Sequence, residues 1–204
     1  MAEECTLRTR DELGQYLNAR GLVGVAVEVG VFAGKFSRTL LRTWRGRRLY
    51  LVDPWSHQRD YLDSWNAADS VHERRFLLAR RRLAEFGDRV VFMRMRSEGA
   101  VVNFSDGALD LVYLDANHAY QYVISDLTAW FPKVREGGLV AGHDYFDAGA
   151  DRNFNPIHGV SLPTRSLTSY GVRSAVDEFV RATRLTLNVT REKWPTWWFV
   201  KGDR

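Results

Sequence analysis

Residues 24–40, GVAVEVGVFAGKFSRTL, combine a strand pattern, a glycine turn and a helix pattern, and this succession most constrains the fold. The first half is a β-branched apolar run typical of a buried strand, whereas helical spacing begins at about Lys35. Gly30 and Gly34 form the turn between them. Glu28 ends the apolar run, and a carboxylate at the end of a buried strand needs a partner.

The same alternation of strand and helix patterns continues along the chain. Ser70 and Glu73 form a capping-box pattern, and Pro132 should kink or end the helix that contains it. The expected strands are 22–29, 47–53, 89–95, 108–115, 137–145, 185–190 and 195–200, and the expected helices are 35–44, 70–86, 170–183 and one that starts at 118. This order predicts an α/β fold with a doubly wound, mainly parallel sheet and antiparallel pairing at the C-terminal end. Ligands of such sheets bind beyond the carboxyl ends of the strands.

Composition predicts one globular domain over residues 1–204, because 45% hydrophobic and 26% charged residues suit a chain of this length. The opening segment MAEECTLRTRDELGQYL has no apolar stretch, so we expect neither a signal peptide nor a membrane span, and a cytoplasmic location. Cys5 is the only cysteine, which excludes intrachain disulfides and C-x-x-C motifs. The net charge is +4, but the densest basic run, ERRFLLARRRLAEF, has helical periodicity and indicates a solvated helix face rather than a nucleic-acid site.

Four of the expected strands end in acids: Glu28, Asp53, Asp115 and Asp144. A dinucleotide site needs G-x-G-x-x-G, whose middle glycine meets the pyrophosphate, but Phe32 stands at that position. Glu28 would also repel a pyrophosphate, so a cationic ligand suits it better. Asp53 ends the second strand, where a carboxylate can accept both hydroxyls of a ribose. Adenosine that carries a positively charged amino acid would satisfy both acids.

Six segments in order, VEVGVFAG, YLVDPW, MRSEGA, LDLVYLDANHAY, VREGGLVAGHDY and WWFVK, make residues 20–201 resemble the class I S-adenosylmethionine-dependent methyltransferases. More narrowly, LDANHAYQYVISDLTAWFPKVREGGLVAGHDY is similar to the macrocin-type O-methyltransferases of methyltransferase family 24. The resemblance implies a Rossmann-like methyltransferase fold, S-adenosyl-L-methionine as cofactor and a small-molecule acceptor, a sugar or another hydroxylated metabolite. The sequence leaves the oligomeric state open, a homodimer included.

The resemblance also implies a set of cofactor contacts. Glu28 and Gly30 would meet the methionine part of the cofactor, and Asp53 would hold the ribose. Trp55 is either a neighbour of the ribose or adenine or an ordinary core aromatic. The full implied set is Glu28, Gly30, Phe32, Gly34, Asp53, Trp55, Ser97, Glu98, Asp115 and Ala116, in which Ser97 and Glu98 would face the adenine.

Asp115, His118 and His143 are the implied catalytic residues, since either histidine could remove a proton from the acceptor beside the methyl group. In macrocin-type relatives, acids at these strand ends bind a divalent cation. The matching residues here are Asp115, His143 and Asp144, so a histidine replaces one acid. Magnesium prefers oxygen ligands, so manganese or another transition ion would tolerate His143 better. Alternatively, Asp115 and Asp144 only hydrogen-bond the acceptor or nearby backbone, and His143 is a base or orients other groups. The acceptor pocket would come from residues 54–69 and 145–168, with Tyr145 either lining it or serving as a loop aromatic.

Two other functions remain open at this point. A catalytically silent S-adenosylmethionine-binding regulator or partner protein would still use Glu28 and Asp53. A nicotinamide-dependent oxidoreductase is disfavoured by Phe32. Methylation of nucleic-acid bases is disfavoured as well, because DANH (residues 115–118) replaces the D-P-P-Y or N-P-P-Y tetrapeptide expected after the fourth strand.

Overall fold

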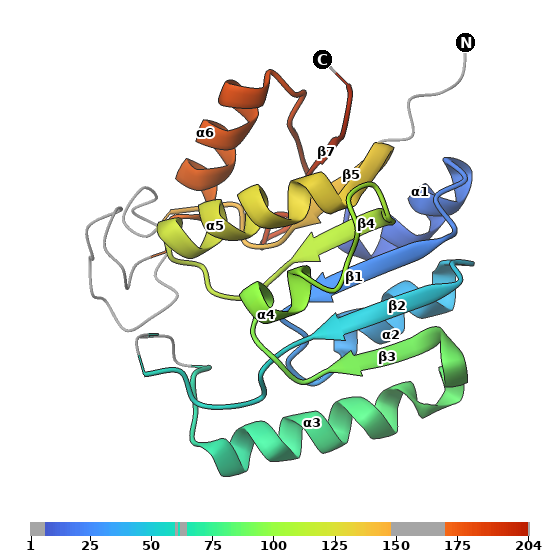
Figure 1. The fold of residues 1–204 in the computed structure, drawn as a ribbon, viewed down its shortest axis with the longest axis vertical. Coiled ribbons are helices and arrows are strands. Elements are labelled where there is room, and N and C mark those ends of the chain that lie inside the picture. The colour runs from blue at the N-terminus through green and yellow to red at the C-terminus, as the bar shows by residue number, and fades with distance from the viewer. Residues whose placement is uncertain (1–6, 60, 62–64, 148–169, 204) are drawn as a thin grey trace.

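A seven-stranded sheet forms the centre of the protein in a computed structural model that describes residues 7–59, 61, 65–147 and 170–203 (Figure 1). The strands are β1 (Val25–Val29), β2 (Arg48–Val52), β3 (Val90–Met93), β4 (Leu109–Leu114), β5 (Val134–Gly142), β6 (Asn188–Val189) and β7 (Trp197–Val200). The α-helices are α1 (Leu13–Ala19), α2 (Lys35–Thr43), α3 (Asp69–Leu83), α4 (Ser97–Val101), α5 (Tyr120–Trp130) and α6 (Val172–Thr183). The 3-10 segments are η1 (Arg10–Glu12), η2 (Ala84–Arg89) and η3 (Phe131–Lys133).

The strand order is β3-β2-β1-β4-β5-β7-β6, with parallel pairing from β3 to β5 and antiparallel pairing of β7 with both β5 and β6. The predicted α/β fold class is therefore confirmed. The order reverses between β1 and β4, and in open parallel sheets a ligand crevice forms at such a switch point. The functional site is expected at the carboxyl ends of these two strands and their neighbours.

Helices cover both faces of the sheet, because alternate side chains of each strand point to opposite sides. On β1, Ala26 joins a core with residues of α1, α2 and α3, whereas Val27 and Val29 join a second core with residues of α4, α5 and α6. Figure 1 shows α4 and α5 in front of the sheet and α2 behind it. The apolar runs read from the sequence are thus strands buried on both faces.

Several element boundaries differ from the predictions. The capping-box prediction is wrong: α3 begins at Asp69 after Ala68, without a side-chain cap, and Glu73 pairs instead with Arg94 at 2.6 Å. Pro132 does end its helix, since α5 stops at Trp130 and a 3-10 segment follows. The expected strand 185–190 is reduced to residues 188–189, and α1 was not predicted.

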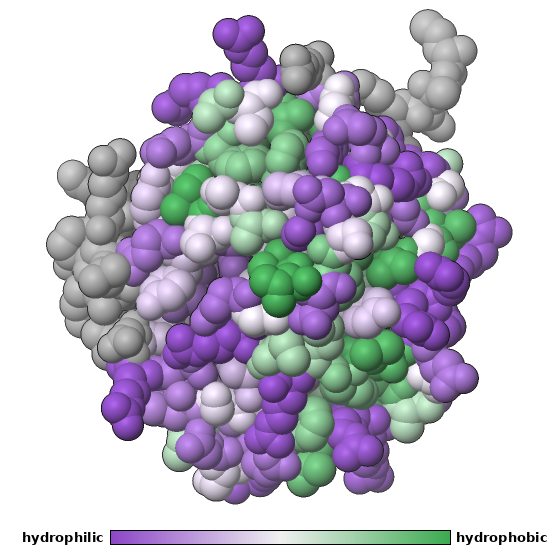
Figure 2. All heavy atoms as spheres, viewed as in Figure 1, coloured by the Kyte–Doolittle hydropathy of each residue, from purple (hydrophilic) through white to green (hydrophobic). Residues whose placement is uncertain are grey.

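The basic run lies on α3, where Ala79 and Leu83 are the buried residues and the arginines lie toward the surface. Hydrophilic residues dominate the lower part of the face in Figure 2, where Figure 1 places α3, with hydrophobic residues between them. Leu77 and Leu78 are exposed there. These features agree with a solvated helix face. Within the described ranges, no helix is long and apolar enough to cross a membrane.

Candidate active site

The four strand-end acids lie at one edge of the sheet. The strands β2, β1, β4 and β5 are neighbours, and their last residues are in register, with Val29 beside both Val52 and Leu114, and Leu114 beside Gly142. Each acid sits at or just after one of these ends. The structure therefore brings together the carboxylates that the sequence placed at separate strands.

Gly30 is required by the turn that follows β1. Its φ is +89°, and a Cβ at this position would lie 1.9 Å from the backbone oxygen of Asp115. Gly34 also has a positive φ, at the start of α2. Phe32 shares the left-handed conformation at φ 55° without being glycine, and Arg75 lies 4.3 Å over its exposed ring. The turn therefore approaches the end of β4 more closely than any side chain would allow.

Asp53 accepts hydrogen bonds from three backbone groups, two of which belong to this turn. Its Oδ2 accepts hydrogen bonds from the N–H groups of Val31 at 3.0 Å and Phe32 at 2.9 Å, and its Oδ1 accepts one from Trp55 at 2.7 Å. Burial raises the pKa of Asp53 although these bonds act to lower it. Three acceptor positions of the carboxylate are thus occupied, and Asp53 fixes the glycine turn. Its contact with a ribose remains a prediction.

Glu28 has a different environment at the end of β1. Its side chain is 2% exposed, and its Oε2 has no hydrogen-bond partner within the described part of the chain. Burial is the main reason that its pKa is raised to about 8, and the nearby Asp115 adds to the effect. The hydroxyl of Ser37 acts in the opposite direction but does not offset burial. A buried carboxyl oxygen without a partner is costly, so this position suits a cationic ligand that would pair with it.

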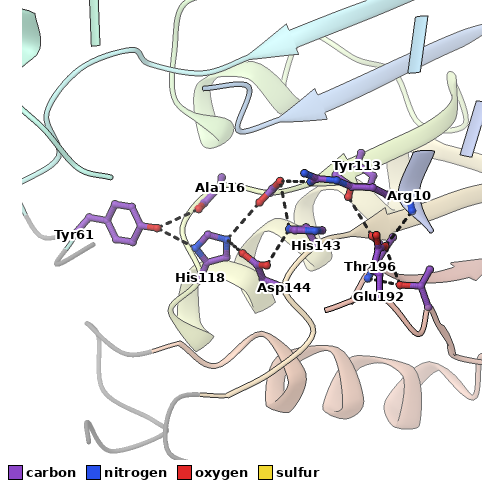
Figure 3. Close-up of polar contacts among 11 residues, drawn as sticks. Arg10, Tyr61, Tyr113, Ala116, His118, His143, Asp144, Glu192 and Thr196 are labelled. Carbon is purple, nitrogen blue, oxygen red and sulfur yellow. Dashed lines mark hydrogen bonds and ion pairs between the residues drawn. The ribbon is translucent and has the colours of Figure 1, made fainter. Parts of the chain in front are cut away.

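Asp115, His118, His143 and Asp144 form a cluster at the ends of β4 and β5. The Nε2 of His118 lies 3.4 Å from Oδ1 of Asp115 and 3.3 Å from Oδ2 of Asp144. The Nδ1 of His143 lies 2.9 Å from Oδ1 of Asp144 and 3.9 Å from Oδ2 of Asp115. Figure 3 shows these contacts as one line of polar groups that runs from Tyr61 toward Arg10. The two aspartates therefore bridge both histidines.

Burial acts to raise the pKa of Asp115, but the hydrogen bond with His118 and the charges of His143 and Arg10 outweigh it and hold this pKa below its ordinary value. The backbone of Asp144 is left-handed at φ 54°, an uncommon state for a non-glycine residue. The cationic or cation-forming groups around Asp115 thus favour its ionised form.

Two residues that contact the cluster were not predicted from the sequence. Arg10, from η1, places its Nη1 3.5 Å from Oδ2 of Asp115. The hydroxyl of Tyr61 lies 3.0 Å from Nδ1 of His118. Both residues come from segments whose sequence shows neither strand nor helix periodicity. Their approach to the cluster therefore depends on the tertiary fold.

The described residues that could hold a metal ion are Asp115, His118 and Asp144, which each offer one ligand atom, all within 4.8 Å of one another. The predicted set had His143 in place of His118. His143 contacts the same two carboxylates, so the difference concerns which imidazole faces the centre of the group. From the sequence, His118 is interpreted as a base or as a helix-start residue that bonds the backbone, and not as a metal ligand.

The two expected adenine contacts, Ser97 and Glu98, have different surroundings. Ser97 donates a hydrogen bond to Asp126 of α5 and accepts one from Nε1 of Trp130 at 2.8 Å. Glu98 is 72% exposed and pairs with Arg96 at 3.6 Å. Burial raises the pKa of Asp126 to about 6. Asp126 was missed, although it shares a helical face with buried apolar residues, which is the signal that could have found it.

Asp126 also lines a small pocket together with Ala116, His118, His143 and Trp197. The predicted contact Ala116 therefore lies between the cluster and α5. Within this pocket Trp197 is fully buried, and its Nε1 has no hydrogen-bond partner among the described residues.

Two aromatic residues named in the sequence lie in packed positions. Trp55 is 1% exposed, donates from Nε1 to the carbonyl of Phe32 at 2.8 Å and packs against Phe76 with ring centroids 4.8 Å apart. This agrees with the core-aromatic alternative. Tyr145 donates a hydrogen bond to Asp177 of α6. Residues 60, 62–64 and 148–168 of the expected acceptor pocket lie outside the described residues.

Comparisons with known proteins agree with this geometry. A family model described as a methyltransferase domain matches residues 27–145, more than half of the chain. No curated protein gives a match. The O-methyltransferase from Bacillus cereus in complex with SAH has a TM-score of 0.64 at 15% identity, over 98% of this chain and 84% of that one.

The O-methyltransferase TomG from Streptomyces achromogenes, involved in tomaymycin synthesis and solved in complex with SAM, has a TM-score of 0.59 at 18% identity, over 95% of this chain and 79% of that one. At these identities the structural likeness establishes the fold. The family match covers both the glycine turn and the strand-end cluster. The chain therefore belongs to the methyltransferase domain family.

Proposed function

We propose that this protein is an S-adenosylmethionine-dependent O-methyltransferase of a small hydroxylated molecule, close to the macrocin-type branch. The observation that carries the proposal is the buried carboxyl of Glu28, whose Oε2 has no hydrogen-bond partner among the described residues and which lies beside a turn that only glycine can make. The ammonium group of S-adenosylmethionine is a cation of the required kind. The neighbours solved with SAM or SAH support this cofactor.

Bound S-adenosylmethionine supplies an electrophilic methyl group on a sulfonium sulfur. The acceptor oxygen forms the new bond to carbon as the sulfur–carbon bond breaks, and the hydroxyl proton passes to a base. The protein must therefore orient the acceptor and hold a base beside it. His118 is suitable, because Asp115 and Asp144 flank its Nε2 at 3.4 and 3.3 Å and would stabilise the imidazolium that forms.

A divalent cation would change this assignment. Asp115, His118 and Asp144 would hold it, and a set with one nitrogen and two carboxylates fits manganese or another transition ion better than magnesium. Such an ion would polarise and position an acceptor hydroxyl. The Nε2 of His118 cannot both bind an ion and take a proton, so a metal-dependent enzyme would leave His143 as the base.

Screening of hydroxylated metabolites with S-adenosylmethionine, read by mass spectrometry, tests the proposal. The expected result is an acceptor that gains the mass of one methyl group in place of hydrogen, with formation of S-adenosylhomocysteine. Binding of the cofactor without transfer to any hydroxylated compound would favour the catalytically silent protein instead.

With an acceptor in hand, activity is measured after EDTA treatment and after manganese or magnesium is restored. Full activity in metal-free protein, with loss in His118→Ala, would assign the base to His118. Loss that manganese restores, with a requirement for His143, would support the metal-dependent arrangement.

A further inference from the structure

Arg10 lies at the candidate site but outside the matched range 27–145. Its guanidinium carbon is 5.3 Å from the centroid of the Phe36 ring, in the first turn of α2, and its Nη1 is 3.5 Å from Oδ2 of Asp115. Its backbone N–H donates to Oε1 of Glu192 at 3.0 Å, which ties η1 to the C-terminal part of the chain. A segment before the sheet thus delivers a fixed cation to the strand ends.

The guanidinium retains capacity for a ligand. It carries five N–H donors in a planar fork, and the neighbouring Asp115 and Tyr113 occupy only part of them. The side chain is 29% exposed, so incoming molecules can reach it. A distance of 3.5 Å is long for a charge-assisted hydrogen bond, which indicates that Asp115 does not saturate this group. Asp115 also has His118 and His143 as partners.

An acidic and a basic side chain lie near each other at the β1–β4 switch point. The carboxyl of Glu28 is at the end of β1, and the charge of Arg10 is close enough to act on it. The amino-acid end of S-adenosylmethionine carries an ammonium and a carboxylate on one carbon. A site that offers one carboxyl and one guanidinium complements both groups, whereas a site with Glu28 alone would repel the carboxylate.

We propose that Arg10 binds the carboxylate of the methionine moiety of the cofactor while Glu28 faces its ammonium group. This assignment rests on the proposed function and adds a cofactor-binding residue from η1. It also gives the N-terminal segment a role in the site: the matched range supplies the adenosine side and the ammonium partner, and η1 supplies the carboxylate partner.

Titration calorimetry with two ligands tests the assignment. S-adenosylhomocysteine keeps the carboxylate, and its decarboxylated analogue, 5′-(3-aminopropylthio)adenosine, retains the ammonium group but lacks the carboxylate. Arg10→Gln is expected to weaken S-adenosylhomocysteine binding by about 10- to 100-fold, the range for one charge-assisted pair, and to leave binding of the analogue unchanged. Arg10→Lys, which keeps the charge but loses the planar fork, should fall between the Gln variant and wild type.

The matched control is Arg8→Gln, because Arg8 is exposed in the same segment and its backbone N–H makes its contact with Glu12. It should bind both ligands as the wild type does, and melting curves of all variants check the fold. Equal binding of S-adenosylhomocysteine by wild type and Arg10→Gln, or equal weakening of both ligands, would overturn the assignment alone. Absence of S-adenosylhomocysteine binding to the wild type would overturn the proposed function with it.

Discussion

Glu28 and Asp115 are acids at the ends of two neighbouring strands, yet their surroundings differ in kind. Glu28 is buried and lacks a hydrogen-bond partner for Oε2 in the described chain, and burial raises its pKa to about 8. Asp115 is only partly buried, with 23% of its side chain exposed, and His118, His143 and Arg10 outweigh the effect of burial and lower its pKa. The comparison shows that cationic partners can outweigh burial in setting the charge of a strand-end acid.

This difference separates two tasks. At neutral pH Glu28 is a protonated carboxyl that becomes ionised when a cation arrives, whereas Asp115 is already an anion with fixed partners. The first suits recognition of a cationic cofactor, and the second suits orientation of a base or an ion. Variants that remove one of these environments and leave the other intact test whether the two acids differ in this way.

Gly30→Val should have the largest effect, because it disturbs the turn between the end of β1, which carries Glu28, and the backbone of Asp115. The added Cβ would meet the backbone of Asp115 at 1.9 Å, in a conformation with φ +89°. We expect the free energy of unfolding to fall by about 4 kcal/mol or more in urea denaturation, with loss of S-adenosylhomocysteine binding.

Gly21→Val is the matched control, because Gly21 has φ +69° and a Cβ there would have no atom within 4 Å. It therefore reports backbone strain without the clash. A Gly30→Val protein as stable as Gly21→Val, with normal cofactor binding, would show that the turn does not approach β4 as described.

Asp115→Asn should have the next largest effect, since it leaves His118, His143 and Arg10 without their shared anion. Breaking such a buried charge cluster costs about 3 kcal/mol at neutral pH, measured by urea denaturation. The folded pKa lies below the ordinary value of 3.8, so this stabilisation is present above that value and is lost as pH falls through the folded pKa. Equal stability of wild type and Asp115→Asn at pH 7 would contradict the described pairing.

Glu28→Gln should have the smallest effect on stability, and with the opposite sign. The wild-type carboxyl ionises at its ordinary value of 4.5 when unfolded and at about 8 when folded, so its free energy of unfolding falls as pH rises between these values. Glutamine removes this loss, and we expect Glu28→Gln to be more stable at pH 8 by about 1–2 kcal/mol while it binds S-adenosylhomocysteine more weakly. A destabilised Glu28→Gln protein at pH 8 would mean that Glu28 has a partner already.

Much of this architecture could be predicted from the sequence, because it depends on local patterns. Apolar runs and helical spacing identified the parallel strands and most helices, and the rule for strand ends placed Glu28, Asp53, Asp115 and Asp144 at one edge. Gly30 was recognisable because its place after an apolar run demands a turn. These features need no knowledge of distant contacts.

The remaining features depend on tertiary approach. Leu13, Tyr16 and Leu17 have the spacing of a buried helix face and could have indicated α1, but nothing local indicates that η1 carries Arg10 to Asp115. Two of the N–H groups that bind Asp53 come from the turn after β1, whose left-handed residue Phe32 is not a glycine and so gave no local signal of this geometry. The capping pattern at Ser70 was misleading, because α3 already begins at Asp69 and the side chain of Glu73 pairs with Arg94.

Proton release on cofactor binding measures whether the carboxyl of Glu28 is protonated until it pairs with a cation. Calorimetric titration of the wild type with S-adenosylhomocysteine at pH 7, in buffers of different ionisation enthalpy, counts the protons exchanged. Because Glu28 is protonated in the unbound protein and ionised beside an ammonium group, we predict release of close to one proton, abolished in Glu28→Gln, and an affinity that rises from pH 6 to pH 8. Binding without a difference in proton release between wild type and Glu28→Gln, or preferential binding of NAD, would contradict the account.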